Sequence, residues 1–273
     1  MTSKHSGNAR TWWLAAGIAL VLASGLLQGC TTPASKPPQD VRTESDQTDT
    51  DRRARVRLEL AAAYFGRGQA ATALDEVKLA LQAKPDLADA HNLRGLIYAS
   101  MGEAGLAEDS FKQALQLNPR DADAMQNYGW FLCQQRRFAD AEVQFNAALA
   151  VPNYRDVTRT LLTMGVCQAR NNQWPEAERT LQRSYELDPA NPTTAVNLSE
   201  VLLRRGEFER ARFYIRRVNA VDELVSAQTL WLAIRIENKL GQAGQVRLLG
   251  NQLVNRFPQS AEALSFEKGR FDE

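Results

Sequence analysis

Five alanines recur along the chain at intervals of 34, 34, 36 and 34 residues. They are Ala73, Ala107, Ala141, Ala177 and Ala211. Each is followed four residues later by an apolar side chain, in order Val77, Phe111, Phe145, Leu181 and Ile215. A period of this length indicates a stack of two-helix units, because one such unit cannot bury its apolar face without neighbours. The pattern therefore favours an interaction scaffold.

The first half of each unit also repeats around a small residue. These residues are Ala61, Gly95, Gly129, Gly165 and Ser199. The two halves together resemble the tetratricopeptide repeat, in which small residues let two helices approach and large ones fill the space between hairpins. Prolines such as Pro85, Pro119 and Pro189 end the second helices. The resemblance implies an all-α fold, a right-handed α-solenoid of six tetratricopeptide helix hairpins with a C-terminal capping helix.

The repeat also predicts how the chain is divided. We expect the tetratricopeptide body at residues 54–273, with units near 54–87, 88–121, 122–157, 158–191, 192–226 and 227–258, and a cap at 259–273. Val151-Pro152-Asn153-Tyr154 lengthens the connector after the third unit. The sixth unit is degenerate, because Gly250 stands where Phe or Leu is expected. Residues 260–267 should form a helix that covers the open face of this last unit. No segment alternates with period two, so no sheet is expected.

The N-terminus has the pattern of an export signal. Lys4 and Arg10 precede an apolar run, which ends in Leu27-Gln28-Gly29-Cys30. This ending resembles a bacterial lipobox and implies that residues 1–29 are a lipoprotein signal peptide and that Cys30 receives a diacylglycerol. A retained transmembrane helix is the alternative, but the run is short for a span. Residues 30–53 are mostly polar and are expected to form a flexible tether.

The charge balance excludes one class of partner. The chain has 33 basic and 32 acidic residues, and a near-neutral protein is a poor non-specific binder of nucleic acid. Six arginines nevertheless gather in the fifth unit: Arg204, Arg205, Arg210, Arg212, Arg216 and Arg217. They are either a solvated helix face or a docking patch for an acidic partner segment or lipid headgroups.

The residues needed for catalysis are sparse. His91 would be the only histidine of the mature chain, and it occupies a repeat position that normally packs a large residue. Cys133 and Cys167 lack metal-site spacing, and no phosphate-binding glycine loop is present. Paired carboxylates such as Glu176 and Glu178 fall on helix exteriors by phase. We expect no enzyme activity, metal, cofactor or small-molecule substrate.

The two cysteines that remain after lipidation form a candidate pair. Cys133 and Cys167 fall on the first helices of units three and four, which are neighbours in the stack. In an exported protein a disulfide would persist, and it is plausible here if the two Cα atoms lie within about 7 Å. Such a bridge would stabilise the fold by roughly 3–4 kcal/mol in the chain-entropy model. Two small buried thiols are the alternative.

The first helices of a tetratricopeptide stack line its concave face. By phase, the candidate partner groove includes Asn92, Gln126, Trp130, Gln134, Arg159, Leu162, Arg170 and Arg204. Trp130 is notable because tryptophan is enriched at binding hot spots. The alternative for Trp130 is packing against the neighbouring first helix, and the alternative for the polar residues is simple solvation.

A narrower resemblance rests on several stretches together. They are Asn127-Tyr128-Gly129-Trp130-Phe131-Leu132-Cys133, Arg137-Phe138-Ala139-Asp140-Ala141-Glu142, Pro152-x-Tyr154, Gly165-Val166-Cys167 and Arg256-Phe257-Pro258. From Cys30 to about Ala263 the chain resembles the PilF/PilW family of type IV pilus biogenesis and stability lipoproteins. The resemblance implies a lipid anchor at Cys30, an outer-membrane location facing the periplasm, and a partner groove around Asn127 and Trp130.

The same resemblance implies a function without turnover. The protein would act as a pilotin that helps the outer-membrane secretin to localise and multimerise, or would stabilise pili by binding other pilus-assembly proteins. Two other scaffolding functions fit the lipobox and the repeats. One is a tetratricopeptide lipoprotein of outer-membrane barrel assembly, and the other is a periplasmic adaptor for peptidoglycan enzymes.

Overall fold

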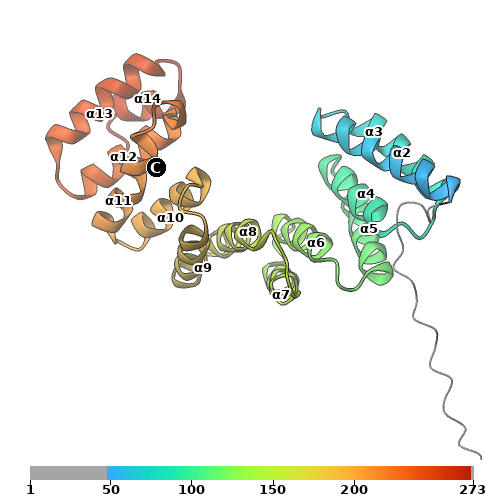
Figure 1. Cartoon of the computed structure of the whole chain (residues 1–273). Coiled ribbons are helices and arrows are strands. Elements are labelled where there is room, and N and C mark those ends of the chain that lie inside the picture. The colour runs from blue at the N-terminus through green and yellow to red at the C-terminus, as the bar shows by residue number, and fades with distance from the viewer. Residues whose placement is uncertain (1–47, 272–273) are drawn as a thin grey trace, which may run out of the picture. The chain divides into compact units, whose positions relative to one another are not determined.

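The computed structural model describes residues 48–271, which fold into helices and contain no strand. Six hairpins follow one another (Figure 1). They pair α2 (Asp49–Gly66) with α3 (Ala70–Ala83), α4 (Ala88–Ser100) with α5 (Ala104–Leu117), α6 (Ala122–Gln134) with α7 (Phe138–Leu149), α8 (Val157–Arg170) with α9 (Trp174–Leu187), α10 (Pro192–Arg204) with α11 (Phe208–Asn219), and α12 (Ala227–Lys239) with α13 (Ala243–Arg256). The helix α14 (Ala261–Glu267) ends the series. The predicted solenoid of six hairpins with a C-terminal helix is confirmed.

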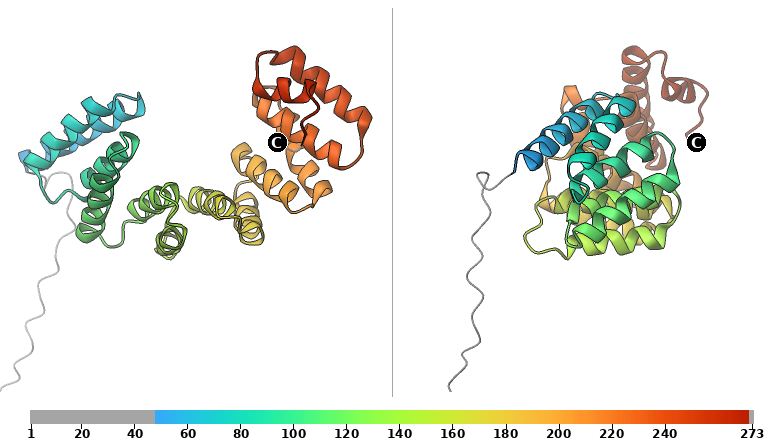
Figure 2. Two further views of the ribbon diagram at one scale, coloured as in Figure 1. Left: turned by 180° about the vertical axis from the view of Figure 1, so that it is seen from behind. Right: turned by 90° about the vertical axis from the view of Figure 1, so that its right-hand side faces the viewer.

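In units two to four, the two helices of the hairpin touch where a glycine meets a large side chain. A Cβ atom added at Gly95 would lie 2.7 Å from the Phe111 ring, and one added at Gly165 would lie 2.6 Å from Leu181 Cγ. Separations this short are steric overlaps, so only a glycine lets the helices approach this closely at these positions. The small residue and the large residue of the repeat therefore fit each other within one hairpin, and Figure 2 shows the resulting close pairs from two sides.

The turns inside the hairpins place one residue in the left-handed region. In four units this residue is a glycine: Gly68, Gly102, Gly206 and Gly241. In units three and four it is Arg136, with φ of 60°, and Asn172, with φ of 57°. A side chain at positive φ is strained, less so for asparagine than for arginine. The turn of unit three is therefore the more strained of the two.

The first helix begins earlier than the tether prediction allows. The sequence interpretation assigned residues up to 53 to the tether, but α2 starts at Asp49. Thr48 caps this helix: its hydroxyl accepts from the Asp51 backbone N–H, and the Asp51 carboxylate accepts from the Thr48 N–H. Such a capping box satisfies donors that a helix start leaves free. The predicted signal peptide, Cys30 and the rest of the predicted tether lie outside the described residues.

The last hairpin is completed by the capping helix. Ser260 caps α14 by accepting from the Ala263 N–H at 3.0 Å. Gly250, in α13, is buried, and a Cβ atom there would overlap the Phe266 ring. Phe266 of α14 thus fills the space that the large side chain of the other units occupies. It also meets Phe271, which stacks on Trp231 with ring centroids 5.8 Å apart.

Candidate functional site

A pocket of about 300 Å³ opens between the first helices of units three, four and five. Its lining residues are Gln126, Asn127 and Trp130 from α6, Arg159, Leu162, Thr163 and Val166 from α8, and Thr193 from α10. These positions share one helix face, because residues three or four apart lie above one another on a helix. The structure thus brings together Gln126, Asn127, Trp130 and Arg159 of the predicted groove.

Trp130 both packs and lines this pocket. Its half-buried side chain packs against the core cluster formed by units two to four. The Arg170 guanidinium lies 4.8 Å from the centroid of the indole ring, close enough for a cation–π contact. One part of the Trp130 ring is therefore covered by packing, and another part faces the pocket.

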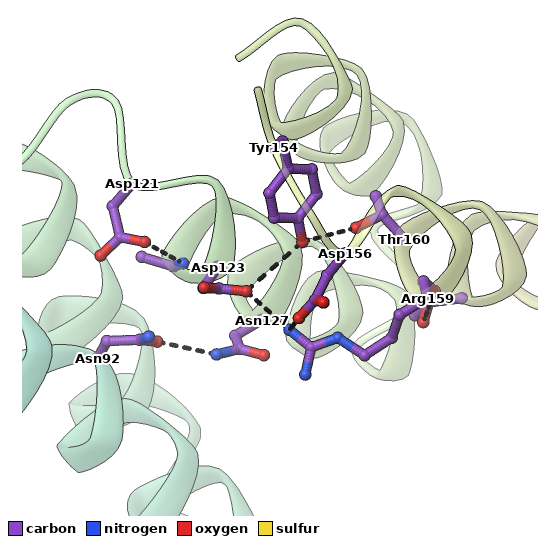
Figure 3. Close-up of polar contacts among 10 residues, drawn as sticks. Asn92, Asp121, Asp123, Asn127, Tyr154, Asp156, Arg159 and Thr160 are labelled. Atoms are coloured by element: carbon purple, nitrogen blue, oxygen red, sulfur yellow. Dashed lines mark hydrogen bonds and ion pairs between the residues drawn. The ribbon is translucent and has the colours of Figure 1, made fainter. Parts of the chain in front are cut away.

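A polar network joins the helices at one end of the pocket (Figure 3). Asn127 donates from Nδ2 to Oδ1 of Asn92 in the preceding unit, at 3.2 Å. Arg159 pairs with Asp123 at 2.8 Å, so α8 is tied to α6. The long connector contributes Tyr154, whose hydroxyl lies 2.9 Å from the Thr160 hydroxyl and 3.5 Å from Asp123.

The network has consequences for charge. Arg159 also lies 3.4 Å from Asp156, so two carboxylates surround its guanidinium. All three side chains are about half exposed, which makes the ion pairs weak contributors to stability. Burial raises the pKa of the Tyr154 hydroxyl, which therefore stays protonated at neutral pH. The network orders the connector and leaves little free positive charge at this end of the pocket.

Gln126 is the buried polar group of the pocket. Its side chain is 5% exposed, and its Oε1 atom has no hydrogen-bond partner among residues 48–271. A buried carbonyl oxygen without a donor costs on the order of 1–3 kcal/mol. The oxygen itself is covered, so a ligand N–H group would reach it and remove this cost only after the Gln126 side chain turns toward the pocket.

The other predicted groove residues lie outside this pocket. Gln134 is exposed at the end of α6, and Arg204 pairs with Glu200 at 3.0 Å. Three lining residues were missed by the sequence interpretation: Thr163, Val166 and Thr193. Val166 and Thr193 occupy the same groove-facing positions of the repeat as the predicted residues. Listing every residue at those positions would therefore have included them.

The two cysteines link the helices that form the pocket. Cys133 of α6 and Cys167 of α8 are joined in a disulfide, with Cα atoms 5.8 Å apart. Cys133 lies three residues beyond Trp130, which is about one helical turn. The bond therefore fixes the separation of α6 and α8 next to the pocket.

His91 has a structural role. It is buried, its Nδ1 accepts from the Arg94 guanidinium at 3.1 Å, and its Nε2 donates to the Pro85 carbonyl at 2.8 Å. Burial lowers the pKa of the imidazole, so it is neutral at pH 7. The core interpretation of His91 is confirmed.

The placement of Glu178 on a helix exterior was wrong. Its side chain is 7% exposed, and it pairs with Arg205 and, at 2.6 Å, with Arg210 of the next unit. Two guanidinium groups can hold a buried carboxylate in its charged form.

Within residues 48–271 there is no cluster of three or more potential metal ligands. The helices of this same range are too short or too polar to cross a membrane.

Comparison with known proteins identifies the repeats. Tetratricopeptide repeat family models match residues 54–77, 88–121, 110–143 and 163–219. The fold and the matched residues define a tetratricopeptide-repeat protein. Scaffolds of this kind present extended helix surfaces to other proteins.

Two solved structures and one sequence relative show which family of tetratricopeptide-repeat proteins the chain belongs to. The crystal structure of PilW, a widely conserved type IV pilus biogenesis factor, matches with a TM-score of 0.73 and 30% identity, covering 78% of this chain and 97% of PilW. PilF of Pseudomonas aeruginosa matches in structure with a TM-score of 0.70 and 24% identity, over 81% of this chain and all of that one. In sequence, the type IV pilus assembly protein PilF of Pseudomonas aeruginosa is 27% identical over 252 residues, which are 92% of this chain and 97% of PilF. The chain belongs to the PilF/PilW family of type IV pilus biogenesis proteins.

Proposed function

We propose that the chain is a non-enzymatic lipoprotein of the outer membrane that faces the periplasm and acts as a pilotin for the secretin of the type IV pilus. The observation that carries the proposal is the pocket between α6 and α8, in a chain that belongs to a pilus biogenesis family. A protein whose pocket offers an aromatic ring and a buried acceptor, without a cluster of catalytic groups among the described residues, is suited to binding.

The pocket fits an extended segment of a partner protein. Once the Gln126 side chain turns toward the pocket, its Oε1 would accept from a backbone N–H of that segment and so gain the hydrogen bond that it lacks. Trp130, Leu162 and Val166 offer apolar contact for a side chain. Because the disulfide and the Arg159–Asp123 pair hold α6 and α8 together, the pocket is formed before the partner arrives, which lowers the entropic cost of binding.

The anchor supports the same proposal. The stretch Leu27-Gln28-Gly29-Cys30 supplies a lipidation signal, and Thr31 after the cysteine favours sorting to the outer membrane. Several acyl chains on Cys30 would hold the protein stably at that membrane, where a secretin assembles. The tether would then leave the repeats free to reach the partner.

Binding of the mature protein to the purified secretin tests the pocket. We expect Trp130→Ala to weaken binding by about tenfold or more, as for a central hot-spot residue. Gln134→Ala is the matched control, because it lies on the same helix, is exposed and does not line the pocket. Circular dichroism of both variants checks that the repeats remain folded.

Two results would count against the proposal. Unchanged affinity of a folded Trp130→Ala variant would show that the secretin binds elsewhere on the chain. If the unsubstituted protein does not bind the secretin, the pilotin mechanism is wrong, and the stabilisation of assembled pili becomes the better account.

A further inference from the structure

The arginines of unit five are mostly engaged by carboxylates of their own chain. Arg205 and Arg210 both pair with Glu178, which lies in the preceding unit. Arg216 pairs at 2.7 Å with Glu237 of the following unit, and Arg212 lies 3.6 Å from the same carboxylate. Glu237 is only 2% exposed, so these contacts join consecutive hairpins. Arg204 pairs with Glu200 of its own helix, so five of the six arginines have a carboxylate partner, and four of them join consecutive hairpins.

Arg217 is the exception, and it lies on an exposed aromatic ring. Its guanidinium is 5.6 Å from the centroid of the Phe213 ring, and no carboxylate of residues 48–271 pairs with it. Phe213 is 55% exposed although it is large and apolar. Its ring meets Tyr214 edge-on, at 5.2 Å between centroids, and Tyr214 meets Tyr185 of α9 in the same way at 4.9 Å. This row of aromatic rings holds Phe213 in a defined position at the surface.

Two hollows meet at Arg217. One, of about 510 Å³, is lined by α11 and includes Phe213. The other, of about 280 Å³, lies between the α9–α10 connector and the end of α11, and includes Val221 and Leu224. These two residues are 44% and 37% exposed and belong to a long connector that contains the 3-10 helix η3 (Asp222–Leu224). The ion pair between Arg256 and Asp222, at 2.7 Å, ties this connector to α13.

We propose that Phe213, Arg217, Val221 and Leu224, here called the Phe213–Arg217 surface, form a second docking site, for a protein segment that places a large apolar side chain next to a carboxylate. The carboxylate would pair with Arg217, whose positive charge lacks a partner in the described part of the chain, and the apolar side chain would enter a hollow beside it. Aromatic and arginine side chains together are typical of interface hot spots. This site is independent of the pocket between α6 and α8, because it lies on second helices and their connectors.

A membrane surface fits these observations less well. Attraction to anionic lipids grows with the number of unpaired basic residues near the surface. Here five of the six arginines are already paired with carboxylates, which leaves Arg217 as the one available cation of the cluster. Two shaped hollows beside a single cation are instead suited to individual side chains.

Selection from a random 12-residue peptide library displayed on phage tests the proposal with the full-length mature protein. Peptides that bind the unsubstituted protein, after removal of those that bind Phe213→Ala, should share an aromatic or large aliphatic residue beside Asp or Glu. Anisotropy of a labelled selected peptide should show affinity about tenfold lower for Arg217→Glu. Arg183→Glu is the matched control, because Arg183 occupies the equivalent exposed position of α9, six residues after Ala177 as Arg217 is after Ala211, and it should leave the affinity unchanged.

Three outcomes would overturn the inference. Enriched peptides without a carboxylate would do so, as would equal losses for Arg217→Glu and Arg183→Glu. Binding to phosphatidylglycerol vesicles that is abolished by Arg217→Glu, with no peptide selected, would assign the surface to a membrane. Arg217 and Arg183 are both exposed, and Arg217 has no ion pair to lose in the described residues. Circular dichroism should therefore show that Arg217→Glu and Arg183→Glu both remain folded.

Discussion

In the degenerate sixth unit, the effect of one substitution on stability should depend on a single neighbouring ring: Gly250→Ala should destabilise the unit when the ring is present and stabilise it when the ring is absent. Phe266 of α14 occupies the space above Gly250 of α13, where earlier units carry their own large side chain. Replacing glycine by alanine inside a helix normally stabilises it by roughly 0.5–1 kcal/mol. In this chain the new methyl group would overlap the Phe266 ring, and overpacking of this kind costs roughly 1–3 kcal/mol. Gly250→Ala alone should therefore destabilise the last unit.

The Phe266 ring should account for all of the stability that Gly250→Ala removes. Phe266→Ala removes a half-buried ring, so it should cost about 2–3 kcal/mol of stability. This is at or below the low end of the cost measured for fully buried phenylalanines. In that background the overlap is gone, and Gly250→Ala should stabilise the unit by roughly 0.5–1 kcal/mol. The coupling between the two sites is then roughly 1–3 kcal/mol, as expected for residues in contact.

Hydrogen exchange followed by mass spectrometry is the appropriate assay, because the end of a repeat stack can open without global unfolding. Exchange of amides in α13 and α14 reports the opening, and about 1.4 kcal/mol corresponds to a tenfold change in its equilibrium constant. Amides in α4 and α5 should not change and serve as the internal control. Additive effects of the two substitutions would refute the assignment of Phe266 to the missing side chain.

Three further predictions concern units two to four. Protein from the periplasm should contain no free thiol at Cys133 or Cys167 by mass spectrometry, and replacing both by serine should cost roughly 3–4 kcal/mol in chemical denaturation. Arg137 and Lys112 lower the pKa of Glu108 to about 2 from its usual 4.5, so its contribution to stability is present above about pH 4.5 and is lost as the pH falls toward 2; the acid-unfolding curve of Glu108→Gln should lack that loss. Arg136→Gly should raise stability by about 1 kcal/mol in thermal melts, because it relieves positive φ, whereas Arg137→Gly should lower it.

The repeat made the fold predictable from the sequence. The spacing of the alanines, together with Gly95, Gly129 and Gly165, predicts the hairpins because close packing depends on residues at fixed separations within one unit. The capping helix was predictable for the same reason, since the last unit must be covered. That Phe266 supplies the side chain missing at Gly250 was not predictable, because no repeat rule covers contacts to a cap.

Side-chain partners between units were harder to predict. Helix phase placed Glu178 outside, but Arg205 and Arg210 of the next unit reach over it and bury it. A run of arginines in the sequence does not show which carboxylates it will meet 20 to 35 residues away, so the pairing of Arg205, Arg210, Arg212 and Arg216 could not be predicted. The unsatisfied Oε1 of Gln126 was equally hidden, because it depends on the absence of a neighbour rather than on a residue type.

Secretin assembly in a deletion strain tests the central claim most directly. Outer membranes would be separated on an unheated detergent gel and probed for the secretin. The account predicts that multimers disappear, or move to the inner membrane, and that the unsubstituted gene restores them while a Cys30→Ser copy does not. Normal multimers in the outer membrane of the deletion strain would contradict a pilotin function. Loss of viability or of cell shape would point instead to barrel assembly or to peptidoglycan enzymes.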